Sequence, residues 1–511
     1  MSSEAPTATS TLPATPTTAS APMPAPARRR SRWRDVPPRE PQAPPADISQ
    51  APPGPHVPRH LLGAYWLLAE HDLLERCRRR YGDVFSLRIW PVGFLVVIAD
   101  PAEIKRVFTS DPDQLRAGEG NVVMQPVAGP ESVLLLDGKR HLNRRKLMLP
   151  PFHGERMGVY ADLIGEITDE EIACWPVGEQ FSAHTSMQRI TLRVILRAVL
   201  GIEDAARGAE LERLLPKLLN SPALLWPFLQ RDMGARSPWR RFVSLRERVD
   251  AILFDEIARK RSDPRLAEHE DILSMLLGAR DEHGDAMTDE ELRDQLVTLL
   301  LAGHETTATG LAWIFERVLR TPEVQARLRT AVAEDDDLYL DCLIKEGLRL
   351  RPVIPLVARQ VNSSFPVGDH TVPAGTLLTC SMILTHSRPD LYPEPDAFRP
   401  ERFMEGAPDT YTWLPFGGGT RRCIGAAFAT LEMKVILRHV FAQCELEAPD
   451  AKPERPRRRF VTYPPNRGAQ VLLRSRHGVG HDMATWKAAS ARLESDRPNE
   501  ARPNARGQIA S

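Results

Sequence analysis

A cysteine at the end of a glycine-rich stretch is the strongest candidate for a reactive or metal-binding residue in this sequence. Residues 415–425 read Pro-Phe-Gly-Gly-Gly-Thr-Arg-Arg-Cys-Ile-Gly, and a helix-forming run over 426–441 follows directly. Three consecutive glycines allow the backbone to approach a flat or bulky group closely. Cys423 would lie next to the helix N-terminus, where the helix dipole is expected to lower the pKa of a thiol.

The glycine-rich loop is therefore predicted to present a thiolate. Small residues surround the cysteine, and Arg421 precedes it by two positions. This combination suits a metal-bound planar cofactor that carries carboxylates. Because short motifs also occur by chance, the alternative is a glycine-rich turn around a buried structural cysteine.

An acid–alcohol pair inside a long apolar helix is the second candidate. Residues 288–291 (Thr-Asp-Glu-Glu) have the pattern of a capping box, and no helix-breaking signal follows before Thr321. The pattern predicts a helix of about 32 residues, or ~48 Å, whose segment 296–302 is apolar on nearly every side. A buried carboxyl group such as that of Glu305, beside the hydroxyl of Thr306, is costly unless it has partners or a function. The pair is either a functional site or a polar kink in which Thr306 bonds back to the preceding turn.

Two further pairs of charged residues have helical spacing. His141 and Arg145 are four residues apart, so they share one helix face and could hold carboxylates; alone, such a pair also fits a solvated basic face. Glu346 and Arg349 lie three apart in a helix predicted over 338–350, and by itself this spacing indicates a surface salt bridge.

Taken together and in order, these motifs resemble those of the cytochrome P450 family. Phe416-x-x-Gly419-x-Arg421-x-Cys423-x-Gly425 is similar to the haem-binding signature of that family. The resemblance covers roughly residues 52–474, with no departure at a fixed position. It implies the cytochrome P450 fold, which is mainly α with a small β-rich region. The other matching motifs are Ala302-Gly303-His304-Glu305-Thr306-Thr307, His141-x-x-x-Arg145, Glu346-x-x-Arg349 and Phe398-x-Pro400-x-x-Phe403.

The resemblance also implies a cofactor and roles for individual residues. The cofactor is haem b (iron protoporphyrin IX), with Cys423 as the thiolate ligand of the iron. Glu305 and Thr306 would relay protons, and His304 is assigned no role. Glu346, Arg349 and Arg402 would form a buried structural triad of charges. The implied cofactor-binding residues are His141, Arg145, Arg359 and Arg421 at the propionates, with Ala302, Gly303, Phe416, Gly417, Cys423 and Gly425 around the ring.

The activity implied is that of a monooxygenase. Such an enzyme inserts one oxygen atom of O₂ into a lipophilic substrate, for example a fatty acid, a terpenoid or a steroid-like molecule. The sequence shows no flavin or iron–sulfur segment, so electrons from NAD(P)H are expected to arrive through a ferredoxin or flavodoxin and its reductase. A peroxide-dependent peroxygenase or a non-enzymatic haem sensor or binding protein is the alternative, and neither would need Glu305 and Thr306.

Composition narrows the function classes further. The 511 residues contain 67 Lys and Arg against 67 Asp and Glu, and this balance argues against a nucleic-acid binder. Six cysteines lie scattered without C-x-x-C spacing, which is typical of a reducing compartment. No run of about 18 apolar residues or signal-peptide core is present. We therefore expect a cytoplasmic protein, a monomer, without a transmembrane anchor.

The chain is predicted to consist of one catalytic domain, residues 52–474, between two disordered tails. Residues 1–51 are rich in Pro and Ala, and 475–511 are polar. The first tail contains an arginine cluster, residues 28–34, which is either a contact for an anionic surface or partner, or simply a solvated basic patch.

Four segments of the catalytic domain carry specific expectations. Val84–Ile89 and Phe94–Ala99 read as a β-hairpin. Residues 115–135 are predicted to form a long irregular loop, and 218–228 either a lid over an apolar pocket or ordinary packing. Residues 457–473 read as a hairpin whose turn lies near 463–465.

Overall fold

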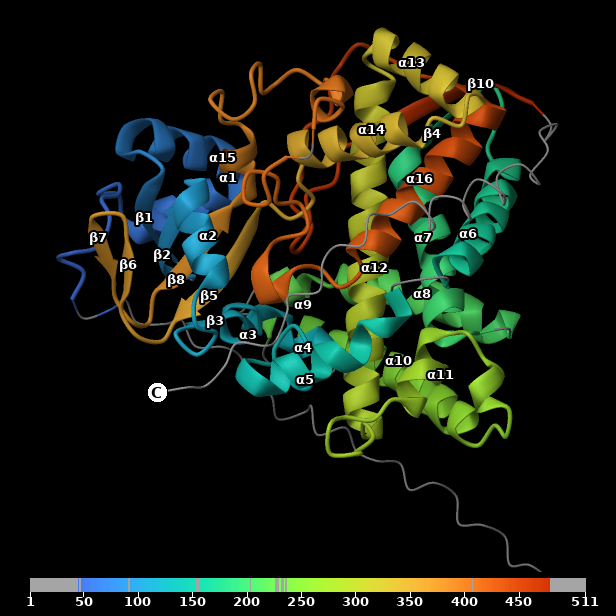
Figure 1. Ribbon diagram of the computed structural model, residues 1–511, viewed down its shortest axis with the longest axis horizontal. Coiled ribbons are helices and arrows are strands. Elements are labelled where there is room, and N and C mark those ends of the chain that lie inside the picture. The colour runs from blue at the N-terminus through green and yellow to red at the C-terminus, as the bar shows by residue number, and fades with distance from the viewer. Residues whose placement is uncertain are drawn as a thin grey trace, which may run out of the picture. The chain divides into compact units, whose positions relative to one another are not determined.

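The computed structural model describes residues 45–477 except for 46, 91, 153–155, 203, 226–228, 231–233, 235–236 and 407. The arginine cluster at 28–34 and most of both predicted tails lie outside the described residues. Helices dominate, and the predicted mainly α fold with a small β-rich region is confirmed. Figure 1 shows strands β1, β2 and β5 to β8 grouped with α1 and α2 on one side of the long helix α12.

The helices make up most of the described chain. They are α1 Arg59–Tyr81, α2 Pro101–Thr109, α3 Ala117–Gly120, α4 Gln125–Ala128, α5 Gly138–Met148, α6 Arg156–Ala173, α7 Ala183–Leu200, α8 Ala205–Leu219, α9 Pro222–Leu225, α10 Pro238–Arg261, α11 Ile272–Gly278, α12 Asp289–Val318, α13 Pro322–Ala333, α14 Asp337–Leu350, α15 Met382–His386 and α16 Ala426–Gln443.

Within the described residues, ten strands form three small sheets. A five-stranded sheet has the order β1-β2-β8-β5-β3, a three-stranded sheet has the order β4-β10-β9, and β6 pairs with β7. The predicted first hairpin is confirmed, since β1 and β2 are antiparallel with Val84 opposite Ile98. The strands are β1 Val84–Ile89, β2 Gly93–Ile98, β3 Leu115–Arg116, β4 Gln180–Ser182, β5 Leu356–Val361, β6 Phe365–Val367, β7 His370–Val372, β8 Leu377–Ser381, β9 Cys444–Glu447 and β10 Gln470–Arg476.

Helix α12 organises the helical region. Its predicted capping box is confirmed: Thr288 Oγ1 accepts the backbone N–H of Glu291, and the Glu291 carboxylate accepts that of Thr288. Helix α7 packs along it so closely that a Cβ on Gly303 would lie 2.7 Å from Ile195 Cδ1. This approach explains a glycine in the middle of a buried helix, despite its low helix propensity.

Three sequence-based expectations are corrected by local structure. Residues 115–135 are largely short helical turns (α3, α4 and a 3₁₀ turn at Val122–Met124) and not an irregular loop. The first predicted tail is too long, because Ile48 and Ala51 pack on the β-rich core. The second begins too early, because β10 pairs with β9 as far as Arg476. Hydrophobic burial and strand pairing at these positions outweigh the polar, proline-rich composition.

The structure also tests, in part, the predictions for the segment 218–228 and for the C-terminal hairpin. Leu218 and Leu224 are 1% and 2% exposed in the helical core, which favours ordinary packing; Trp226 and Phe228 lie outside the described residues. The hairpin exists only as bridges pairing Pro456 with Pro465 and Arg459 with Thr462, so its turn lies at 460–461. The predicted turn at 463–465 is therefore wrong, because Pro464 belongs to one arm, where its carbonyl accepts the N–H of Arg457.

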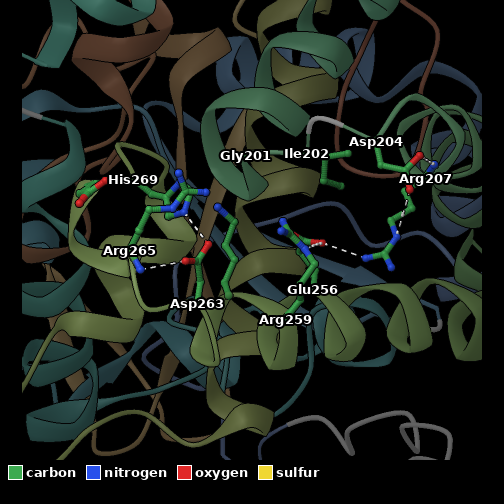
Figure 2. A pocket seen from close by; sticks show the side chains of 11 residues that line it. Gly201, Ile202, Asp204, Arg207, Glu256, Arg259, Asp263, Arg265 and His269 are labelled. Carbon is green, nitrogen blue, oxygen red and sulfur yellow. Dashed lines mark hydrogen bonds and ion pairs between the residues drawn. The ribbon is translucent and has the colours of Figure 1, made fainter.

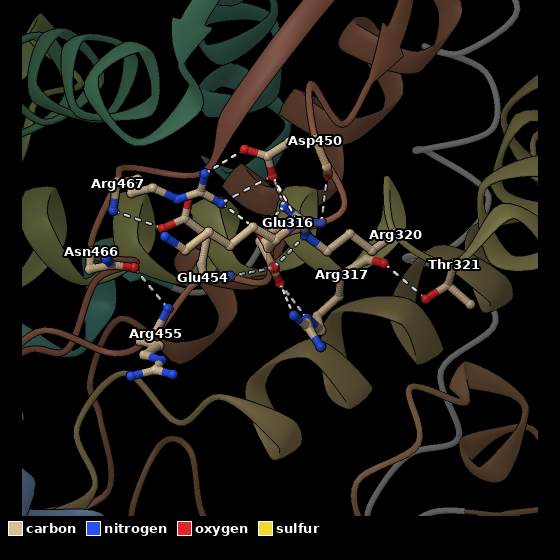
Figure 3. A network of polar contacts seen from close by, with 10 residues as sticks. Glu316, Arg317, Arg320, Thr321, Asp450, Glu454, Arg455, Asn466 and Arg467 are labelled. Atoms are coloured by element: carbon tan, nitrogen blue, oxygen red, sulfur yellow. Dashed lines mark hydrogen bonds and ion pairs between the residues drawn. The ribbon is translucent and has the colours of Figure 1, made fainter.

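The C-terminal end of α12 is fastened to the segment 454–467 (Figure 3). Glu316 Oε1 accepts the backbone N–H of Glu454 at 3.1 Å. Nearer the N-terminus of the same helix, Trp313 Nε1 donates to the carbonyl of Tyr463 at 2.7 Å. These bonds hold the 454–467 segment against α12.

A buried cluster of charges links α14 to the segment before the glycine-rich loop. Glu346 is fully buried and accepts two hydrogen bonds from Arg349, at 2.7 and 2.9 Å, and one from Arg402 Nε at 3.1 Å. The His386 ring continues the link: Leu414 N donates to Nε2 at 2.9 Å, so Nδ1 carries the proton and donates to the Arg349 carbonyl. The cluster thereby joins α14 to the residue just before the loop.

None of the described helices is both long enough and apolar enough to cross a membrane.

Removal of one charge from this cluster should destabilise the protein strongly. We expect Arg349→Ala to lower the free energy of unfolding by about 3–5 kcal/mol, because it leaves Glu346 buried without its closest cation. If Arg349→Ala does not fold, Arg402→Ala provides the same test, with a smaller expected loss of stability. Urea unfolding followed by far-UV circular dichroism measures the effect.

The matched control is Arg76→Ala, which removes an ion pair whose side chains are 70% and 48% exposed. Its expected cost is below about 1 kcal/mol. Equal unfolding midpoints for the three variants would contradict a stabilising role for the buried cluster.

Candidate active site

The glycine-rich loop is shaped by one close backbone contact and one internal hydrogen bond. The backbone N–H of Cys423 donates to the carbonyl of Phe416 at 2.9 Å, which closes the loop on itself. Gly419 has φ +63°, and a Cβ there would lie 2.1 Å from the Phe108 carbonyl oxygen, so only glycine fits. Helix α16 begins just beyond the cysteine, with Gly425 as its N-cap.

The thiol of Cys423 is accessible, but its pKa is raised. Although Cys423 keeps an exposed surface, the protein packed around the loop desolvates its thiol, and this effect on the pKa outweighs the N–H of Gly425 and the nearby Arg145 and Arg422. The expectation of a thiol pKa lowered by the helix dipole is therefore wrong for the free side chain. Metal coordination deprotonates a thiol outright, so this thiol is suited to a metal ion and poorly suited to free thiolate chemistry.

Four predicted propionate-binding residues lie within electrostatic reach of one another. His141 is 4% exposed, and burial together with Arg421, Arg145 and Arg359 lowers its pKa to about 3. His141 is therefore neutral at pH 7, which corrects the expectation of two cations on one face of α5. Its ring remains available as a hydrogen-bond donor.

The arginines of this cluster have too few anionic partners. Arg421 forms an ion pair with Asp137 at 2.6 Å and donates to the carbonyls of Val133 and Leu136. Arg359 is 8% exposed, and within the described residues it makes no ion pair; its guanidinium donates a 2.9 Å hydrogen bond to the neighbouring carbonyl of Ala358. A buried guanidinium without a counter-ion is costly, so the cluster suits a ligand with carboxylates.

The central turn of α12 exposes small residues where its neighbours are buried. Ala302 is exposed although Leu300 and His304 are each 1% exposed. The hydroxyl of Thr306 donates back to the Ala302 carbonyl, as the sequence predicts. This turn therefore borders a solvent-accessible space inside the helical region.

Glu305 and Thr306 have different partners. Glu305 Oε2 accepts a 2.6 Å hydrogen bond from Gln188 Nε2, while Oε1 lies 3.5 Å from an Arg459 nitrogen and 3.7 Å from His184 Nε2. Burial raises the pKa of Glu305, and Arg459 and Gln188 oppose this shift. Adjacent residues on a helix do not face each other, so the carboxylate lies toward α7 while the threonine bonds along α12.

Comparison with known proteins identifies the family. The sequence profile described as Cytochrome P450 matches residues 52–471, most of the chain. The chain belongs to the cytochrome P450 family. It is accordingly a haem-thiolate monooxygenase of the oxidoreductase class.

Relatives of this P450 occur in mycobacteria. It is 41% identical over 435 residues to cytochrome P450 135B1 of Mycobacterium tuberculosis, which covers 84% of this chain and 92% of the relative. It is 40% identical over 432 residues to cytochrome P450 135A1 of the same species, with 84% and 96% coverage. These names state a subfamily and no substrate.

Solved structures show the same fold. The retinoic acid-bound cyanobacterial CYP120A1 matches with a TM-score of 0.74 and 24% identity, over 83% of this chain and 99% of that one. The heme domain of cytochrome P450DA matches with a TM-score of 0.72 and 21% identity, over 86% and 99%.

The residues of this P450 fit the haem that the family implies. A haem carries two propionates, which match the arginines left without enough carboxylates, above all Arg359. Cys423, which is accessible, would supply a sulfur ligand to its iron. The small, exposed Ala302 leaves space beside α12.

Sequence reasoning missed the residues that surround Glu305. His184, Gln188 and Arg459 come from α7 and the 454–467 segment, at least 117 residues away in the chain. His304, left without a role, is buried with its Nδ1 3.2 Å from the Thr191 hydroxyl. Of these residues, only His304 could have been noticed in the sequence, because it is a polar residue in an apolar helix.

A cavity of about 660 Å³ lies elsewhere, between the end of α7, α8 and α10 (Figure 2). Its charged side chains find partners within the cavity: Glu256 forms ion pairs with Arg207 and Arg259, and Asp263 Oδ2 lies 2.9 Å from His269 Nε2. None of its lining residues belongs to the cysteine loop or to α12, so we do not assign it to the active site.

Glu432 of α16 is a buried acid that the sequence analysis did not single out. It is 1% exposed, and within the described residues neither carboxylate oxygen accepts a well-formed hydrogen bond. Burial raises its pKa to about 8, and only the Thr307 side chain opposes the shift. Glu432 therefore holds its proton at neutral pH, next to the α12 turn that carries Thr306.

Glu432 should make stability depend on pH. Between pH 4.5, its ordinary pKa, and about pH 8, the folded state binds a proton that the unfolded state releases. The contribution of Glu432 to the free energy of unfolding is therefore fully present below pH 4.5. It falls as the pH rises, by at most roughly 1.4 kcal/mol per pH unit, until about pH 8. We expect Glu432→Gln to gain stability relative to wild type between pH 5 and pH 8.

Urea unfolding midpoints of both proteins across this range provide the measurement, with the exposed Glu323→Gln as control. A difference between Glu432→Gln and wild type that stays constant with pH would show that the buried acid is not protonated.

Proposed function

We propose that this P450 oxidises a lipophilic organic substrate with O₂, using electrons delivered by separate redox proteins and protons delivered through Glu305 and Thr306. The observation that carries the proposal is the position of Glu305. Its Oε1 is buried without a hydrogen bond among the described residues, beside a partly exposed arginine and a neutral histidine. A carboxylate kept in this condition is able to accept and release a proton.

The cofactor would be held by the residues already described. Cys423 would bind the iron, Phe416 would shield the sulfur, and His141, Arg145, Arg359 and Arg421 would bind the propionates. Bound haem supplies the site at which O₂ is reduced and one oxygen atom is transferred to substrate. Gly417, with φ +67°, allows the turn in the loop, and Gly303 allows the close approach of α7.

Protons are proposed to pass from the surface to Glu305 and then to Thr306. Arg459 is 32% exposed and its nitrogen lies 3.5 Å from Glu305 Oε1, so it connects the acid with solvent. The Thr306 hydroxyl can give up its bond to the Ala302 carbonyl, take up a proton through water and pass its own hydroxyl proton onward. Positioned proton donors of this kind accelerate reactions by about 10²–10⁴-fold.

The electron donor is proposed to be a ferredoxin or flavodoxin, itself reduced by NAD(P)H through a reductase. A surface cavity of about 480 Å³ supports this, because its lining includes Lys139, Arg145 and Lys146 against a single acid, Glu282. Arg145 also lies within electrostatic reach of Cys423, which brings this cationic surface close to the sulfur. Complementary charge would steer an acidic partner to this face. The site of action is proposed to be the cytoplasm, and the protein a monomer.

Turnover with surrogate redox partners tests the proposed proton path. We expect Thr306→Ala to keep consuming NAD(P)H while product formed per NAD(P)H falls about tenfold or more and hydrogen peroxide rises. The control is Thr330→Ala, which removes a threonine with the same bond to its own helix, far from the loop.

Peroxide alone discriminates between the alternatives. A monooxygenase with this proton path needs O₂ and NAD(P)H, and Glu305→Gln should impair that reaction more than a peroxide-driven one. Unchanged coupling in Thr306→Ala would refute the relay, and product formation that requires peroxide in every case would favour a peroxygenase.

A further inference from the structure

Helix α1 presents an apolar face to solvent. Leu61 and Leu68 are 63% and 87% exposed, and Ala64 between them is exposed too. The spacing i, i+3, i+7 places these three side chains on one side of the helix. The opposite side is the one that packs on the sheet, through Leu62 and Trp66. The helix is therefore apolar on both sides, and only one side is covered.

The exposed face continues onto the turn between β1 and β2. The backbone N–H of Trp90 donates to the carbonyl of Arg59 at 3.2 Å, and its ring lies 5.5 Å from that of His60. Trp90 itself is 43% exposed. The α1 face, as we call it, comprises Val57, Leu61, Ala64, Leu67, Leu68, Trp90 and Val92, and all are exposed.

This concentration is unusual within the described chain. The other exposed large hydrophobic residues in the described part of the chain, such as Val177 and Leu338, lie far from one another in the sequence. Scattered exposed apolar residues need no explanation, whereas a contiguous patch marks an interaction surface.

The charge around the α1 face selects the kind of partner. Arg59 and Arg88 are exposed beside it, and the two acids that follow on the solvent side of α1, Asp72 and Glu75, are paired with Arg76 and Arg79. A second copy of the chain would bring this cationic edge against itself, which disfavours a symmetric dimer. An apolar surface with a cationic edge fits an anionic lipid bilayer, into which leucine and tryptophan side chains insert while arginines meet the headgroups.

We propose that the α1 face binds peripherally to the surface of an anionic membrane. A helix of this kind binds more strongly as its buried apolar area and its attraction to anionic lipids increase. The proposal does not depend on the oxidation chemistry.

Flotation of the full-length protein with lipid vesicles tests the proposal. Vesicles contain phosphatidylglycerol and phosphatidylcholine in equal parts, or phosphatidylcholine alone. We expect binding to the anionic vesicles that weakens at high salt, and a partition coefficient lower by about tenfold or more for the double variant Leu61→Gln/Leu68→Gln. Glutamine keeps the helix propensity of leucine, so the variant should unfold at the wild-type urea midpoint.

Leu338→Gln is the matched control, because Leu338 is 55% exposed on α14 and lies outside the α1 face. It should bind vesicles as wild type does. Three outcomes would overturn the proposal: no binding to anionic vesicles, equal binding by the double variant and wild type, or equal binding to both vesicle types. A dimer in solution that the double variant abolishes would instead make the face a self-association surface.

Discussion

The position of one sulfur atom, Sγ of Cys423, is the constraint on which the rest of the site depends. Its loop is closed by the Cys423–Phe416 hydrogen bond and pressed against the Phe108 carbonyl at Gly419. The residue before the loop is fastened through His386 to Arg349, and thus to the buried Glu346. Burial disfavours a free thiolate at this position, so the loop presents its sulfur to a metal ion that replaces the proton.

The same physical argument explains the charges around the loop. Arg359 is buried and makes no ion pair among the described residues, and it shares with Arg421 the charge of Asp137. His141 is kept neutral by burial and by neighbouring arginines. Without a ligand, such a cluster of buried cationic groups opposes folding. A dicarboxylate ligand relieves this cost, which couples cofactor binding to stability.

Local signals in the sequence were sufficient for much of this fold. The capping box at Thr288, the cysteine loop and the bond from Thr306 to Ala302 depend on residues close together in the chain. The environment of Glu305 was not predictable, because Gln188 and Arg459 reach it only after α7 and the 454–467 segment pack on α12. The raised pKa of the Cys423 thiol was missed for a related reason: burial is a tertiary property that the motif does not reveal.

The central claim is that Cys423 supplies a thiolate to haem iron, and the absorption spectrum of the reduced protein under carbon monoxide tests it most directly. The account predicts a Soret maximum red-shifted to the position typical of thiolate ligation, lost in Cys423→Ser. A wild-type spectrum without that shift, or a serine variant that retains it, would contradict the account.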